Sequence, residues 1–399
     1  MKAQERLIIK NFGPIVEADI DIKPFMVFIG ESGSGKSVIL KLLSLFRWIY
    51  KKNALRDIAK KVGIKKELYR FRIETMLKES GLEDFCVKGS EAHYYVGNSC
   101  VSITCNGKPH LKPTQPSNEV VLEKISFITD DRFAIPMLVN NQIRGTLPYH
   151  LEKTFDDFAV SFNHLQRNKS VKTKIFDIEL SLEKYGAIEN RLYINLKNSK
   201  TQLHNASSGI KSVSIVELIS TYFVINKEYM QNKYTDFIVD IFSKSQNRNP
   251  ESFLQNLRTI KPNKERYSLF IEEPELSLFP NAQKKLVEYL VNLCFYVDTK
   301  KTIQVAFSTH SPYILSSLNC LLLAYEVANK NPILKEKVET IIPNKFWLDI
   351  NKFNAFKVEN GEVFSIIDKE TNLILAESID EVSEEIGETF DKLLELESK

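Results

Sequence analysis

The chain has 399 residues, of which 43% are hydrophobic and 26% are charged, and its formal net charge is +3. This length allows two or three lobes, or one elaborated domain, and so small a net charge excludes no class of partner. No apolar run approaches about 18 residues, so we expect no membrane span, and the opening MKAQERLIIKNFGP gives no reason to expect a secretory signal. Five scattered cysteines without a C-x-x-C pair indicate reduced thiols in a cytoplasmic protein.

Short β-rich runs open the chain, and a helical pattern follows them. The runs are residues 7–9, 16–22 and 25–29. Apolar residues then recur at helical spacing from 38 to 46. Further strands are expected at residues 94–95, 101–105 and 125–128.

The second half of the chain predicts more helix than strand. Residues 150–182 read as helical and polar, a strand returns at 192–196, and a second helical stretch runs from 211 to about 256. Near the end, a hairpin over residues 356–364 turns at Asn360-Gly361. An acidic amphipathic helix then begins at a capping box of Ser378 and Glu381.

Residues 30–37, GESGSGKS, fit the phosphate-loop pattern G-x-x-x-x-G-K-S without a mismatch, between a strand and a helix. The pattern comprises Gly30, Glu31, Ser32, Gly33, Ser34, Gly35, Lys36 and Ser37. Its glycines allow backbone N–H groups to turn toward phosphate oxygens, and the helix adds its positive N-terminal end. Lys36 should reach the β- and γ-phosphates of ATP, and Ser37 should ligate Mg²⁺. The alternative is a Gly/Ser-rich turn without a ligand.

Two acids follow an apolar strand in the segment SLFIEEP, which ends at Pro274. Glu272 would bind Mg²⁺, and Glu273 would act as general base on the attacking water. The alternative is a strand that simply reaches solvent at two acids. A second apolar strand ends in STHSP, where His310 could contact the γ-phosphate or could be an ordinary surface histidine.

The order GESGSGKS, SSGIK, IEEPELSLFP and STHSP resembles the ABC-type ATPases, in the branch that holds RecF, the SMC heads and the overcoming-lysogenisation-defect (OLD) proteins. The resemblance covers about residues 5–320. It implies that Lys36 and Ser37 are the Walker A residues, that Glu272 replaces the Walker B aspartate, that Glu273 is the catalytic glutamate and that His310 is the switch histidine. Ser208 and Gly209 match the signature motif, whereas Ile210 and Lys211 depart from it. For the Q-loop, Gln142 and the Asp131-Arg132 pair are candidates that also read as surface residues.

The resemblance also implies an architecture, which is an α/β ABC-type P-loop ATPase head with a mixed sheet, a helical lobe and a small C-terminal β-hairpin plus helix. We divide it into residues 1–145, with Walker A and a basic insertion, 146–265, a helical lobe with the signature, 266–345, with Walker B and the switch histidine, and 346–399. Two heads of this type pack head to tail, so the signature of one caps ATP held by the other. A homodimer with ATP and Mg²⁺ is therefore expected.

Full-length OLD nucleases carry an Asp-x-Asp cluster after the ATPase, but the one Asp-x-Asp of this sequence is Asp19 and Asp21, on an early strand. The chain instead resembles the stand-alone OLD-like ATPases of anti-phage systems such as Septu, PARIS and some retrons. These act with a separate effector, a nuclease or toxin. The alternatives are a RecF-like DNA-repair clamp and the ATPase subunit of a transporter.

One segment is strongly basic. Residues 51–78 hold ten Lys or Arg against three acids, a net +7, with Tyr69 and Phe71 interleaved. Such a segment could contact nucleic acid or an acidic partner, or it could be a solvated helical face.

Overall fold

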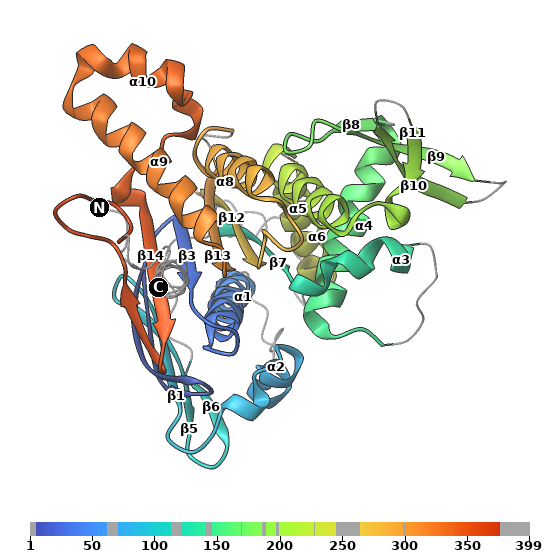
Figure 1. The fold of residues 1–399 in the computed structure, drawn as a ribbon. Coiled ribbons are helices and arrows are strands. Elements are labelled where there is room, and N and C mark those ends of the chain that lie inside the picture. The colour runs from blue at the N-terminus through green and yellow to red at the C-terminus, as the bar shows by residue number, and fades with distance from the viewer. Residues whose placement is uncertain are drawn as a thin grey trace, which may run out of the picture.

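A mixed sheet of 11 strands forms the centre of the computed structural model (Figure 1). The described residues are 5–61, 71–112, 121–139, 146–168, 170–185, 189–196, 199–226, 228–244, 264–297 and 301–375. The strand order is β6-β5-β4-β1-β2-β15-β14-β3-β13-β12-β7. These strands are β1 (Glu5–Phe12), β2 (Ile15–Ile22), β3 (Phe25–Ile29), β4 (Glu91–Val96), β5 (Ser99–Cys105), β6 (Pro109–Lys112), β7 (Val121–Ile128), β12 (Lys264–Glu272), β13 (Thr302–Thr309), β14 (Phe353–Glu359) and β15 (Glu362–Ser365).

Helices pack against this sheet, and a second, antiparallel sheet lies at one side of the molecule, next to α4 (Figure 1). The small sheet has the order β11-β10-β9-β8, with β8 (Ser170–Lys172), β9 (Glu179–Tyr185), β10 (Glu189–Leu196) and β11 (Ser199–Gln202). The helices are α1 (Lys36–Lys61), α2 (Ile73–Glu79), α3 (Ile135–Val139), α4 (Tyr149–Asn168), α5 (Ser208–Ile225), α6 (Tyr229–Lys244), α8 (Pro280–Phe295), α9 (Pro312–Lys330) and α10 (Lys335–Ile341). The predicted α/β class with a mixed sheet is confirmed.

The two faces of the central sheet belong to two cores. In β3, Phe25 and Val27 point into a core shared with α5, α8 and α9, whereas Met26 and Phe28 point into a core shared with α1. This is the period-two alternation of a strand that is buried on both faces. The parallel part of the sheet is thus a layer between helices, which holds its strand ends rigidly.

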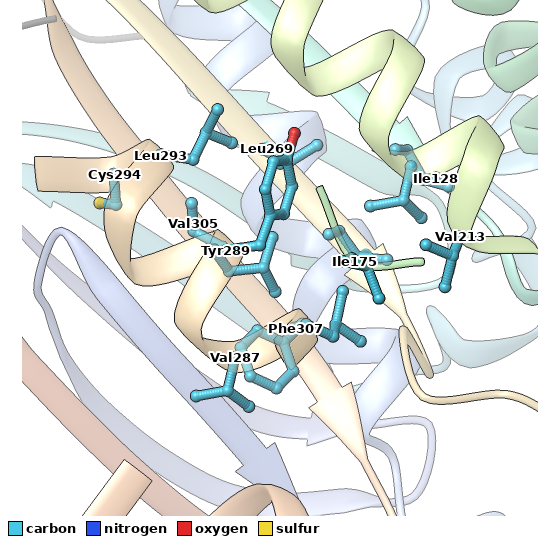
Figure 2. Close-up of a cluster of buried hydrophobic side chains, with 14 of the residues drawn as sticks. Ile128, Ile175, Val213, Leu269, Val287, Tyr289, Leu293, Cys294, Val305 and Phe307 are labelled. Carbon is cyan, nitrogen blue, oxygen red and sulfur yellow. The ribbon is translucent and has the colours of Figure 1, made fainter. Parts of the chain in front are cut away.

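α5 and α8 form the larger core with β12 and β13 (Figure 2). Tyr289 of α8 shares hydrogen bonds with Ser220 and Thr221 of α5, at 2.7 and 2.8 Å between the oxygens. α5 is the one described helix that is long and apolar enough to cross a membrane, and 67% of that stretch is buried inside the protein. A buried core helix meets the same test, so this helix is only weak evidence for a span.

Two expectations for the helical region are wrong. The helix expected over residues 150–182 ends at Asn168 and strands follow, because Ile178, Leu180 and Leu182 alternate with polar residues. The second helical stretch breaks after Ile225. There the Asn226 side chain accepts hydrogen bonds from the N–H groups of Glu228 and Tyr229, both at 3.1 Å, and α6 begins.

The predicted C-terminal hairpin forms, but it does not stand apart from the central sheet. β14 pairs parallel with β3, and β15 pairs parallel with β2. The turn is at Asn360 and Gly361, both with positive φ, as a tight hairpin requires. The predicted acidic helix from Ser378 lies outside the described residues.

A buried carboxylate ties the small sheet to α5. Glu217 of α5 accepts hydrogen bonds from the backbone N–H groups of Lys174 and Ile175, at 2.7 and 2.8 Å, in the loop between β8 and β9. Burial raises the pKa of Glu217 to about 7, against the effect of these hydrogen bonds. The folded protein therefore favours the neutral carboxyl more than the unfolded chain does.

The stability that Glu217 contributes should therefore fall as pH rises through about 7. Glu217→Gln cannot ionise, so the Tm of the variant minus that of the wild type should increase between about pH 5 and pH 8. Thermal melts followed by circular dichroism at several pH values measure this difference. Glu228→Gln, at an exposed position just before α6, is the matched control for the removal of one carboxylate. A Tm difference for Glu217→Gln that does not change with pH would contradict the titration.

Candidate active site

Four parallel strands end at one edge of the central sheet. The register pairs Ile29 with Thr309, Glu272 with Ser308, and Ile271 with Ile128. Their carboxyl ends are therefore level, and the segments that follow β3, β13, β12 and β7 meet there. Ligands of open α/β sheets bind at such an edge. The predicted P-loop, Glu272, Glu273 and His310 lie at or directly after the ends of these strands, whereas the predicted signature residues Ser208 and Gly209 lie at the start of α5.

The P-loop lies between β3 and α1. At Gly30 and Gly35 the space available explains why glycine is required. A Cβ on Gly30 would lie 2.3 Å from the carbonyl oxygen of Val358 in β14. A Cβ on Gly35, at φ +113°, would lie 2.5 Å from Ile15 Cδ1. In the described structure the buried Ser34 hydroxyl has no hydrogen-bond partner. A loop with an unused donor at the N-terminus of a helix fits phosphate oxygens.

The Lys36 side chain folds back and bonds to the backbone of the P-loop. Its Nζ donates to the carbonyl oxygens of Gly30 and Glu31, at 2.7 Å each, and the residue is buried. Burial lowers the pKa of Lys36, while Glu273, Glu275 and Glu31 oppose this effect. Acids of the P-loop and of the segment after β12 therefore help to keep the ammonium group charged. Its two partners are weak acceptors compared with phosphate.

Ser37 and Glu272 form the candidate metal pair. The side chains of Ser37 and Thr129 lie near the Glu272 carboxylate and act to lower its pKa, and Glu272 is only 5% exposed. Burial raises the pKa of Glu272, Asp130 adds to this effect, and Lys41 opposes it. A buried carboxylate beside a hydroxyl is the hard-oxygen donor set that Mg²⁺ prefers. The residues therefore fit the predicted metal.

Glu273 leaves the strand in a different direction from Glu272. Its backbone has φ +43°, the left-handed region, which costs a non-glycine residue about 1–3 kcal/mol. Its N–H donates to the Ser308 carbonyl at 3.1 Å. Its Oε1 lies 3.2 Å from His310 Nε2, and both side chains are 32% exposed. The predicted base and switch histidine are therefore in contact at the accessible side of the site.

Glu275 belongs to the site although its role was not predicted. It is buried, and its Oε1 accepts hydrogen bonds from Thr309 Oγ1 at 2.7 Å and from the His310 N–H at 2.9 Å. Burial raises its pKa, against these two hydrogen bonds. Glu275 therefore holds the backbone at His310. The sequence signal that could have identified Glu275 is its place as the third acid of IEEPE.

Arg132 was a Q-loop candidate or a surface residue, and it is fully buried. Its NH1 donates to the carbonyls of Thr129 at 3.0 Å and Glu272 at 2.8 Å, and its NH2 donates to the Glu273 carbonyl at 2.6 Å. Its Nε donates to Ser212 Oγ at 2.8 Å. It therefore supports the backbone of the acidic pair. Gln142 lies outside the described residues.

The signature residues begin α5. Ser207 caps this helix by accepting a hydrogen bond from the Ile210 N–H at 3.4 Å, and this leaves Ser208 exposed. Gly209 is buried, and a Cβ there would lie 2.6 Å from the Ser277 carbonyl oxygen. Only glycine allows this approach. The signature therefore packs on the turn that follows Glu273.

A cavity of ≈ 680 Å³ opens beside the metal pair. Lys41, Asp130 and His150 are among the residues that line it, with Ser37 and Glu272. Burial lowers the pKa of His150 to about 4, so this ring is neutral at pH 7. Among the described residues, no group of three or more His, Cys, Asp or Glu is arranged to hold a metal.

Residues of the basic segment 51–78 have different environments in the structure. Lys60 and Lys61 are exposed at the end of α1, and Tyr69 lies outside the described residues. Phe71 packs edge-on against Trp48, at 6.3 Å between ring centroids. Its ring therefore serves the protein's own packing.

Residues 255–315 match the AAA ATPase domain family, and no curated protein matches the chain. Among solved structures, the SMC head bound to the C-winged-helix domain of ScpA aligns at 11% identity, with 91% of this chain, 97% of that chain and a TM-score of 0.40. The SMC head domain from Thermotoga maritima aligns at 13% identity over 92% of this chain and 98% of that chain, with a TM-score of 0.36. The third structure is an Smc head with an extended coiled coil, bound to the C-terminal domain of ScpA derived from Pyrococcus furiosus. It aligns at 10% identity over 92% of this chain and 96% of that chain, with a TM-score of 0.37. The family match includes Glu272, Glu273 and His310, and it supports an ATPase.

Proposed function

We propose that this chain is an ABC-type ATPase that works as a head-to-tail homodimer and controls a separate effector in anti-phage defence. The observation that carries the ATPase proposal is the meeting of the P-loop with Glu272, Glu273 and His310 at one sheet edge. The match to the AAA ATPase domain family is consistent with this chemistry.

The position of each residue at the sheet edge indicates its proposed role in ATP hydrolysis. Bound MgATP supplies the phosphoryl group and a metal that neutralises its charge. Lys36 would exchange its two carbonyl partners for phosphate oxygens, and Ser37 and Glu272 would hold the metal. Glu273 accepts a proton from the attacking water at Oε1, where His310 Nε2 orients it.

Lys36→Ala should abolish ATP binding, because it removes the cation that the loop surrounds. Glu273→Gln should still bind ATP but hydrolyse it at least about a hundredfold more slowly, because the amide cannot accept the proton. Calorimetry with MgATP and a phosphate-release assay measure the two properties, and thermal melts check that each variant is folded. Equal turnover in wild type and Glu273→Gln would remove Glu273 as the base.

The surface around the signature supports a composite dimer site. Ser208 is exposed at the N-terminus of α5, where N–H groups favour an anion. Phe279, which ends the turn packed by Gly209, is 80% exposed. A large exposed aromatic residue beside an exposed helix N-terminus suits an interface. We propose that a second copy covers both.

Ser208→Arg should leave ATP binding to one head intact but reduce hydrolysis and ATP-dependent dimerisation, because it blocks the cap on the partner's nucleotide. Mixed with Lys36→Ala, it should regain part of the activity, since each heterodimer holds one intact composite site. Turnover of the mixture and light scattering with and without ATP measure this. A mixture no more active than its components would mean that each head works alone.

The output belongs, in our proposal, to a separate nuclease or toxin rather than to this chain. Two of the acids clustered at the sheet edge, Glu272 and Glu273, serve the nucleotide in this proposal. Asp19, the first acid of Asp-x-Asp, pairs with Arg6 across β1 and β2, which supports strand pairing as its role. The acidic segment that begins at Glu377 is our proposed contact for a basic effector.

The purified chain should therefore hydrolyse ATP without nicking plasmid DNA in Mg²⁺ or Mn²⁺. Co-expression with the neighbouring gene should yield a complex that charge reversal at Glu384, Glu385 and Glu388 weakens. Charge reversal at Glu336 and Glu339, exposed on α10, is the control and should have no effect. Metal-dependent cleavage that a change in one of the chain's own acids abolishes would refute a separate effector. DNA binding that falls steeply with salt would favour the DNA-clamp alternative.

A further inference from the structure

Arg132 connects two parts of the site that are far apart in the sequence. Three of its four hydrogen bonds go to the backbone carbonyls of Thr129, Glu272 and Glu273, at the ends of β7 and β12. The fourth goes to Ser212 on α5. Of the four, only the Ser212 bond reaches the helix that begins with the signature.

Ser212 has a specific place on that helix. It lies four residues after Ser208, so the two share one face of α5, one turn apart. Ser212 is 1% exposed, and Arg132 is completely buried. Water does not compete for their hydrogen bond. A tilt or shift at the N-terminus of α5 would therefore move the guanidinium group rather than simply break an exposed contact.

The other end of the guanidinium contacts the most unusual backbone of the site. Glu273 has left-handed φ, and its carbonyl receives the shortest of the four Arg132 bonds, at 2.6 Å. Its N–H is bonded to the Ser308 carbonyl. The Glu273 carbonyl also accepts a hydrogen bond from the Leu276 N–H at 3.0 Å. The backbone of Glu273 is thus held from both sides, and Arg132 is the side chain that bonds to its carbonyl.

The charges around Arg132 allow it to remain a cation in the interior. Burial lowers its pKa to about 10, and Glu275, Asp130, Glu272 and Glu273 oppose this effect. A guanidinium with a pKa near 10 is charged at pH 7, so its four bonds keep their charge-assisted strength. Its planar fork of donors reaches several acceptors at fixed angles, which suits it to orient backbone groups.

We propose that Arg132 is a positioning residue that couples the N-terminus of the signature helix, through Ser212, to the backbone of Glu273. A contact made at Ser208 by a second copy would then set the orientation of the Glu273 carboxylate. This inference rests on the proposed ATPase and adds an internal route by which dimerisation regulates it. The coupling is local, because one side chain spans the whole distance.

Ser212→Ala tests the coupling more cleanly than a change at Arg132, which would remove four buried hydrogen bonds at once and could unfold the chain. Ser214→Ala is the matched control. Ser214 lies on the same helix and is also buried, but its hydroxyl has no hydrogen-bond partner in the described structure. Both variants should melt within a few degrees of the wild type and bind MgATP with unchanged Kd.

The kcat of Ser212→Ala should fall about tenfold, whereas that of Ser214→Ala should stay at the wild-type value. Ser212→Thr, which keeps the hydroxyl, should recover activity. In the Glu273→Gln background, single-turnover hydrolysis should not fall further when Ser212→Ala is added, because the route acts through Glu273. Equal kcat in the two alanine variants, or the same fold loss with and without Glu273, would overturn the coupling. Failure of the wild type to hydrolyse ATP would refute the proposed function instead.

Discussion

The level ends of four parallel strands determine where every candidate catalytic group lies. β13 pairs with β3 on one side and β12 on the other, and β12 pairs with β7. A slip of one residue in any of these pairs would turn a site residue to the other face of the sheet. The packed helices on both faces prevent such a slip, because β3 alternates between two separate cores. The stability of the sheet and the geometry of the site are therefore one constraint.

The positions of the P-loop, the acidic pair and His310 could be predicted from local sequence, because these three motifs lie at or directly after the ends of strands. The spacing of GESGSGKS and the position of Glu272 and Glu273 after an apolar run were sufficient to predict that these residues lie at the ends of strands. Arg132 and Glu275 were not assigned correctly, since their roles depend on partners distant in the chain. Arg132 reaches Ser212, 80 residues away, and Glu272, 140 residues away. No local pattern encodes such contacts.

The fold was predictable to a similar depth. The strands that open the chain and the helix after the P-loop were predicted, whereas residues 170–182 were assigned to a helix although β8 and β9 form there. No prediction covered α8 and α9. The C-terminal hairpin was found, but its insertion between β3 and β2 was not. Pairing of β14 with β3 joins segments more than 300 residues apart, as Phe356 and Phe28 show. Strand pairing at that separation depends on packing of the whole domain.

The two adjacent glutamates, to which we propose different roles, show how the environment distinguishes identical residues. Glu272 ends β12 in the sheet register, where burial makes its charge costly without a cation. Glu273 turns through left-handed backbone and leaves its carboxylate one-third exposed beside His310. One carboxylate therefore favours metal and the other favours water. Because a left-handed turn at a non-glycine residue is intrinsically unfavourable, neighbours must hold it. The hydrogen bonds from Arg132 and to Ser308 do so, and the separation of roles depends on them.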